Sequence, residues 1–143
     1  MRALHADGKE SVRFLKVRLR PVPPTDSRRI ARWVADLDAD EFEVRGKATA
    51  ALAELEELAE PALRRALADR PSAELRIRVE SLLKALATGS SPERLRALRA
   101  VEVLELLATP EASELLATLG RGAPAARLTR EATSALERLN ARP

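Results

Sequence analysis

One spacing recurs four times in this chain of 143 residues. A small or branched apolar residue is followed by Leu four positions later and by a second Leu three positions after that. The copies are Ala48/Leu52/Leu55, Val79/Leu83/Leu86, Ala100/Leu104/Leu107 and Ala132/Leu136/Leu139. Positions i, i+4 and i+7 fall on one face of an α-helix, so each copy predicts a buried helical stripe. The chain is therefore restricted to a short stack of helices that bury these stripes against one another.

The rest of the sequence favours an all-α fold. Ala, Leu, Arg and Glu dominate, and all four are strong helix formers. Aromatic residues make up only 2% of the chain, so the core has to be built from Ala, Leu and Val. Asp7 or Ser11 is the expected start of the first helix. We expect about eight helices, over residues 11–19, 27–38, 40–58, 61–68, 73–86, 92–107, 110–119 and 125–139.

We expect one helical domain, residues 1–143, with three parts. Residues 1–24 form an N-terminal helix and a Pro-rich connector, residues 25–88 a first helical block, and residues 89–143 a second block. Pro21, Pro23 and Pro24 end the first part, because a residue that precedes Pro is disfavoured in the α conformation. The interval from Val79 to Ala100 is shorter than the other intervals between stripes, which predicts a compact, irregular bundle.

Charge is distributed unevenly along the chain. The net charge is +3 overall, yet residues 1–35 hold nine Lys and Arg against three Asp and Glu. This basic cluster is the one charge feature that suggests a ligand contact. Its members are Arg13, Lys16, Arg18, Arg20, Arg28, Arg29 and Arg32. The candidate contacts for a protein partner or a nucleic acid are Arg18, Arg20, Arg28, Arg29, Arg32 and Trp33.

Residues suited to catalysis or to metal binding are few. There is no Cys, His5 is the single histidine, and no Gly-rich phosphate-binding motif occurs. The acidic segment 36–43 lacks the spacing of a calcium loop, and its acids are expected to complement the dipole of the following helix. We expect no catalytic residue, no cofactor and no metal. No apolar run is long enough to span a membrane, and the lack of Cys favours a cytoplasmic location.

Two segments resemble HEAT repeats. In residues 40–52, Val44-Arg45 is followed by Ala48 and Leu52, and in residues 59–67, Pro61 precedes Leu63 and Leu67. Residues 100–119 resemble the related repeats of phycobilisome lyases. The longer string from Arg20 to Leu63 resembles a helical segment appended to large bacterial WD40-repeat proteins, and this resemblance extends over about residues 10–140.

The resemblance implies stacked helical hairpins, an α-solenoid fragment and the pairing of an Asp of the acidic segment with Arg45. It also implies a binding role without enzymatic activity. The expected function is therefore a protein-interaction or structural module within a larger multidomain protein. Two alternatives remain open. One is a HEAT-like nucleic-acid-binding domain that uses the basic cluster, and the other is an enzyme related to HEAT-fold DNA glycosylases or to lyases.

Overall fold

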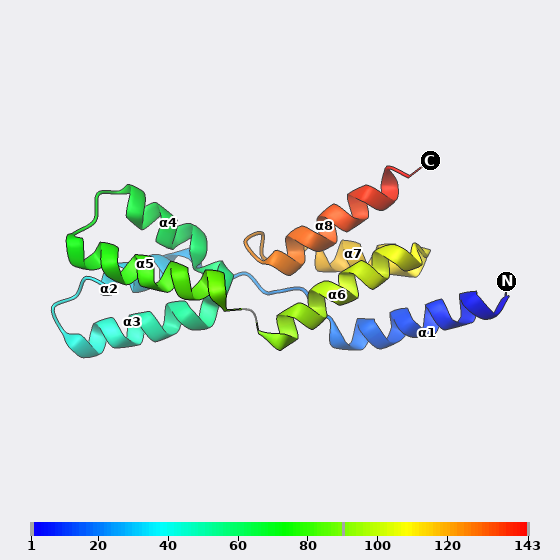
Figure 1. The fold of residues 1–143 in the computed structure, drawn as a ribbon, viewed down its shortest axis with the longest axis horizontal. Helices are drawn as coiled ribbons and strands as arrows, with labels where there is room; N and C mark the ends of the chain where they lie inside the picture. Colours follow the sequence, from blue (N-terminus) through cyan, green and yellow to red (C-terminus); the bar gives the residue numbers. More distant parts are fainter. Residues whose placement is uncertain (1, 90, 143) are drawn as a thin grey trace. The chain divides into compact units, whose positions relative to one another are not determined.

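The computed structural model describes residues 2–89 and 91–142, and for residues 2–7 it describes the main chain only. Within these ranges the regular structure is entirely helical, which confirms the all-α prediction. The helices are α1 (Arg2–Arg18), α2 (Ser27–Asp36), α3 (Phe42–Leu55), the 3₁₀ helix η1 (Glu56–Leu58), α4 (Glu60–Ala68), α5 (Ala73–Thr88), α6 (Pro92–Leu107), α7 (Pro110–Leu119) and α8 (Arg127–Asn140) (Figure 1).

The helices divide into two compact units. The inserted unit comprises Thr25–Ser90 and holds α2 to α5. The discontinuous unit combines Met1–Pro24 with Ser91–Pro143 and holds α1 and α6 to α8. The N-terminal segment thus groups with the C-terminal helices and not with the helices that directly follow it in the sequence.

In the inserted unit, two helical hairpins pack in two layers. Helix α2 contacts α3 in the first hairpin, and α4 contacts α5 in the second, while α2 also contacts α4 and α3 contacts α5. A polar contact joins the hairpins, because Arg78 Nη1 donates a 2.9 Å hydrogen bond to the carbonyl oxygen of Leu37. The buried core of this unit consists of Ile30, Leu37, Ala48, Leu52, Ala59, Leu63, Val79 and Leu82.

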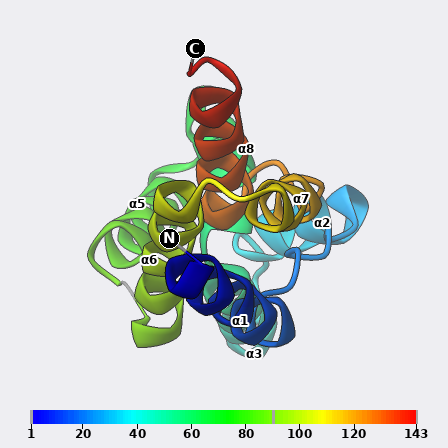
Figure 2. The same cartoon turned by 90° about the vertical axis from the view of Figure 1, so that its right-hand side faces the viewer.

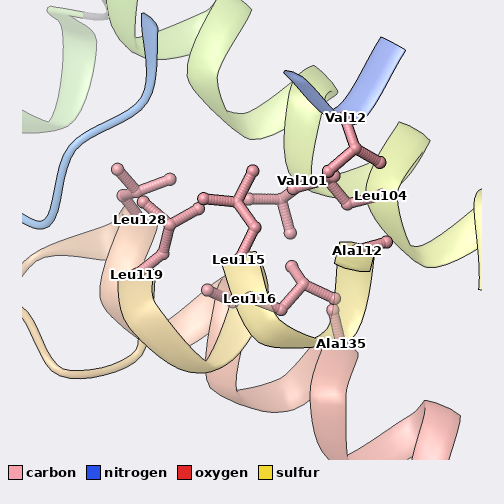
Figure 3. Packing of buried hydrophobic residues seen from close by; sticks show 10 residues of the cluster. Val12, Val101, Leu104, Ala112, Leu115, Leu116, Leu119, Leu128 and Ala135 are labelled. Carbon is pink, nitrogen blue, oxygen red and sulfur yellow. The ribbon is translucent and has the colours of Figure 1, made fainter. Parts of the chain in front are cut away.

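In the discontinuous unit, α6, α7 and α8 contact one another, and α1 lies against α6 and α7 (Figure 2). Val12 of α1 meets Val101 and Leu104 of α6 and Leu115 of α7 in one buried cluster (Figure 3). Val22, in the connector after α1, packs at the edge of the same cluster. Helix α1 is therefore an integral part of this core.

The four repeated stripes line these two cores, as predicted. Their first residues, Ala48, Val79, Ala100 and Ala132, are all buried. Leu52 and Leu104 are also buried. The other leucines are partly buried and pack against the cores, namely Leu55, Leu83, Leu86, Leu107, Leu136 and Leu139. One correction applies in α5, where Leu82 and not Leu83 is the buried leucine.

Several helix ends differ from the sequence prediction, among them the end of α2, the start of α3 and the end of α5, each by two residues. Helix α1 begins at Arg2 and not at a cap near Asp7 or Ser11, since no Pro interrupts the helix-forming residues before that point. Helix α3 stops at Leu55, because Glu56 adopts a φ of 52° and the chain continues as the 3₁₀ helix η1. Helix α8 begins at Arg127, two residues later than expected, and end shifts of this size are common.

Candidate functional site

The six predicted contact residues fall in both units. Arg18 and Arg20 belong to the discontinuous unit, and Arg28, Arg29, Arg32 and Trp33 belong to α2 of the inserted unit. The guanidinium carbon of Arg18 lies 4.4 Å from the ring centroid of Phe14, and Phe14 is an exposed side chain. Arg20 follows α1 and is exposed.

On α2, the predicted contacts have different surroundings. The guanidinium carbon of Arg29 lies 4.8 Å from the ring centroid of Trp33, and Trp33 is partly buried against the core of the inserted unit. Arg32 is exposed, whereas Arg28 lines a groove between α2 and α4. Of these four residues, Arg28 is thus the one that lines this groove.

Two further members of the basic cluster face acidic residues. Arg13 and Lys16 of α1 line a cavity of about 300 Å³ together with Glu111 and Glu114 of α7. At the same cavity, Lys9 Nζ lies 3.3 Å from Glu111 Oε1. Hydrogen bonds from the main chain of Glu111 itself and from Lys9 lower the pKa of the Glu111 carboxyl group. Positive charge on this side of α1 is thus met by carboxylates of α7.

Contrary to the prediction, Arg45 does not pair with a carboxylate of the preceding acidic segment, all of whose residues the structure describes. Arg45 Nη1 donates hydrogen bonds to the carbonyl oxygens of Ala39, at 2.8 Å, and Asp40, at 2.6 Å. These acceptors are main-chain oxygens of the preceding loop, because Arg45 lies in the first turn of α3 and its side chain reaches back over that loop. Arg78 makes a contact with a carboxylate of the other hairpin, with Nη1 4.0 Å from Asp38 Oδ1.

The described part of the chain contains neither a candidate metal site nor a candidate membrane-spanning helix. Residues 8–89 and 91–142 contain no group of three or more His, Cys, Asp or Glu side chains placed to hold a metal ion. In the same part, no helix combines the length and the hydropathy that crossing a bilayer requires. The side chain of His5 lies outside the described residues.

The α2–α4 groove is the feature that the sequence analysis missed. It is an open groove of about 660 Å³ on the inserted unit, bordered by α2, α4 and the start of α5. Its floor is apolar and consists mainly of alanine methyl groups. The apolar residues of the floor are Ala31, Val34, Ala35, Ala62, Ala66 and Leu75. Both α2 and α4 contribute a pair of alanines four residues apart, so only short side chains project into the groove at these positions.

Charged side chains stand at the rim of the α2–α4 groove. Arg28 comes from the first turn of α2, Arg65 from α4, and Asp69 from the residue that ends α4. Arg65 Nε donates a long 3.4 Å hydrogen bond to the carbonyl oxygen of Pro61 in its own helix. Within the described residues, no carboxylate lies within ion-pair distance of Arg28 or Arg65. The rim therefore holds two guanidinium groups against one carboxylate.

A second charged group lies between α6 and α8. Arg138 donates to both carboxylate oxygens of Glu105, from Nε at 2.9 Å and from Nη2 at 2.7 Å, and Arg142 Nη2 lies 3.5 Å from Glu105 Oε1. The hydrogen bonds from Arg138 are the main reason that the pKa of Glu105 is lowered. Such a bidentate ion pair holds α8 against α6, and the charges of its two members compensate each other.

Comparison with known proteins adds no assignment to this geometry: no family model matches the chain, and no curated protein and no solved structure matches it significantly.

Proposed function

We propose that this protein is a non-enzymatic protein-interaction module within a larger multidomain protein, and that the α2–α4 groove is its binding surface. The groove carries the proposal, because it combines an exposed apolar floor with two guanidinium groups that have no carboxylate of the described residues within ion-pair distance. Apolar patches that are open to solvent and rimmed by polar residues are typical of protein-binding sites.

The depth of the groove favours a macromolecular partner. Ala31 and Ala35 of its floor are exposed residues, so the floor is shallow and open. Sites for small molecules are usually concave enough to bury about 70–90% of the ligand surface. A shallow groove between two helices cannot enclose a small molecule to that extent, but it offers contact area to a protein segment.

The packing of the inserted unit supports a HEAT-like assignment. Its hairpins α2–α3 and α4–α5 stack with their first helices in one layer and their second helices in the other. Stacked hairpins of this kind present long surfaces for binding, and each hairpin buries its apolar face against its neighbour. The assignment rests on this arrangement together with the resemblance of residues 40–67.

The two carboxyl groups with shifted pKa values, Glu105 and Glu111, are not suited to act as general acids. The pKa values of Glu105 and Glu111 are both lowered, the first by Arg138 and the second by its own main chain and Lys9. General acids need raised pKa values to hold a proton near neutral pH. Both carboxylates are instead held in the charged form by structural partners.

Nucleic-acid binding is the alternative, and the contacts of the basic cluster speak against it. Arg13 and Lys16 line a cavity with carboxylates, and Trp33 packs against the core. A fluorescence titration of the full chain with single-stranded and duplex DNA at low salt tests this alternative. Tight binding that weakens steeply with added salt would establish it in place of the proposal.

The proposal itself is tested by affinity capture from the source organism with three forms of the full chain. Ala31→Trp fills the groove at an exposed position, and Ala50→Trp places the same bulk at an exposed position of α3 away from the groove. We expect partners that wild type and Ala50→Trp retain and Ala31→Trp loses, and that bind again as purified proteins. Equal retention by all three forms would remove the groove as the binding surface.

A further inference from the structure

We infer that the α2–α4 groove accommodates one amphipathic α-helix of a partner protein, whose apolar stripe is flanked by Asp or Glu residues. This inference rests on the proposed function and specifies the chemistry of the partner. Three observations support it: the lack of main-chain bonding partners in the groove, the small side chains of its floor, and the charge of its rim.

The walls of the groove determine the conformation of the bound segment. Helices α2 and α4 use their main-chain N–H and C=O groups within their own turns, so their facing surfaces offer side chains only. An extended peptide would lie on the apolar floor with its own main-chain groups unpaired, which costs free energy for each buried group. An α-helix satisfies those groups internally and is therefore the conformation that fits.

The floor of the groove permits close approach of a third helix. Ala31 and Ala35 on α2 and Ala62 and Ala66 on α4 present single methyl groups, while the larger Val34 and Leu75 fill the space between them. Packed helices lie about 8–10 Å apart, and small side chains at the contact allow the shorter distances. Larger apolar side chains at i, i+3, i+4 and i+7 of the bound helix would then fill the volume of about 660 Å³.

The positive charge of the rim favours a partner with negatively charged side chains. Arg28 and Arg65 line the groove without a carboxylate of the described residues in ion-pair distance, and Asp69 offsets only one of the two charges. In two other cavities a cation of the lining has a carboxylate partner, since Lys9 pairs with Glu111 in one and Arg138 pairs with Glu105 in the other. A guanidinium group binds a carboxylate through two parallel hydrogen bonds, so Asp or Glu beside the apolar stripe complements this rim.

The test is a selection from a displayed library of helix-forming peptides of about 18 residues, long enough for five helical turns. The full chain serves as the target, and the Ala31→Trp chain serves for counter-selection, so that only groove-dependent binders remain. We expect these binders to share an apolar stripe with spacing i, i+3, i+4 and i+7 and to carry Asp or Glu beside it.

Affinity measurements on the selected peptides then test the charge. The double variant Arg28→Glu/Arg65→Glu should weaken binding about tenfold or more, because two charge-assisted contacts become repulsive. Lys47→Glu on the exposed surface of α3, outside the groove lining, should leave the affinity within about twofold, as expected for a charge away from the contact. Both variants change exposed residues, and circular dichroism confirms that they are folded.

The other outcomes contradict the inference in distinguishable ways. Groove-dependent binders without acidic residues, or with affinities that the double variant leaves unchanged, would overturn the acidic helix and leave the proposed function standing. Recovery of no groove-dependent peptide would also overturn it, and the capture experiment with Ala31→Trp then decides on the proposed function separately. Self-association of the full chain that Ala31→Trp abolishes would identify a second copy as the occupant.

Discussion

The main-chain N–H of Ala123 donates a 2.7 Å hydrogen bond to the carbonyl oxygen of Val22. This bond joins the connector after α1 to the turn between α7 and α8, two segments far apart in the sequence. Val22 also packs against the core that α6, α7 and α8 form. The extended segment after α1 is thus fixed to the discontinuous unit before the chain enters the inserted unit.

Gly122→Ala should destabilise the discontinuous unit. A Cβ atom at this position would lie 2.7 Å from Thr129 Oγ1 and 2.9 Å from the main-chain nitrogen of Val22. Main chain and a buried residue have to move to relieve these contacts, and overpacking of this kind costs about 1–3 kcal/mol. Urea-induced unfolding measures the change, and an unchanged midpoint would show that the connector does not lie this close.

Gly46→Ala is the matched control for that substitution. Gly46 lies within α3, and a Cβ atom there would meet no heavy atom within 4 Å. Because Ala is the better helix former, this variant should gain about 0.5–1 kcal/mol in the free energy of unfolding. The two Gly→Ala substitutions are therefore expected to change stability in opposite directions.

Leu52→Ala should remove about 2–5 kcal/mol of unfolding free energy, the usual cost of deleting a buried leucine side chain. Leu52 is fully buried in the core of the inserted unit. Leu106→Ala makes the same chemical change on a leucine that is 80% exposed, and should alter stability by less than about 0.5 kcal/mol. A loss below about 1 kcal/mol for Leu52→Ala would contradict the burial of this stripe.

Glu105→Gln should make the stability of the protein less dependent on pH. The folded-state pKa of Glu105 is lowered, so its contribution is present at neutral pH and is lost as the pH falls below about 4.3, the ordinary value for Glu. The stability difference between wild type and Glu105→Gln should therefore shrink between about pH 7 and about pH 3. The exposed Glu80→Gln is the control, and a difference for Glu105→Gln that stays constant would contradict the assignment.

Ser72→Ala should weaken the contact between the two hairpins of the inserted unit. Ser72 Oγ accepts a 3.1 Å hydrogen bond from the N–H of Leu75 at the start of α5 and donates a 2.9 Å bond to Asp38 Oδ1. Loss of an N-cap of this type costs about 0.5–2 kcal/mol, which thermal unfolding detects. Ser81→Ala on the exposed face of α5 should have almost no effect, and equal effects of both variants would disprove the cap.

The starts of α6 and α7 were predicted accurately, because their signals are local. Pro92 and Pro110 each begin a helix at the predicted residue, and Ser91 and Thr109 cap those helices through their side-chain oxygens. The end of α3 was predicted three residues too late. Glu56 has a left-handed conformation there that Glu rarely adopts, so its residue type gives no signal for a helix end.

The grouping of residues 1–24 with residues 91–143 could not be read from the sequence. It depends on which apolar stripe Val12 meets, and several stripes of the same Ala/Leu type were available. The α2–α4 groove escaped prediction for a related reason. The spacing of Ala31/Ala35 also occurs in Ala108/Ala112, where Ala112 is buried, so whether an alanine with this spacing is buried or open depends on the neighbouring helix and not on the spacing.

The discontinuous unit also has a consequence for protein synthesis. The ribosome makes α1 first, yet α6 and α7, which cover Val12, emerge only after all of the inserted unit has been translated. Helices α2 to α5 are consecutive and can fold as soon as they leave the exit tunnel, because their contacts are local. Until α6 and α7 have been made, the apolar face of α1 therefore has no partner of its own unit.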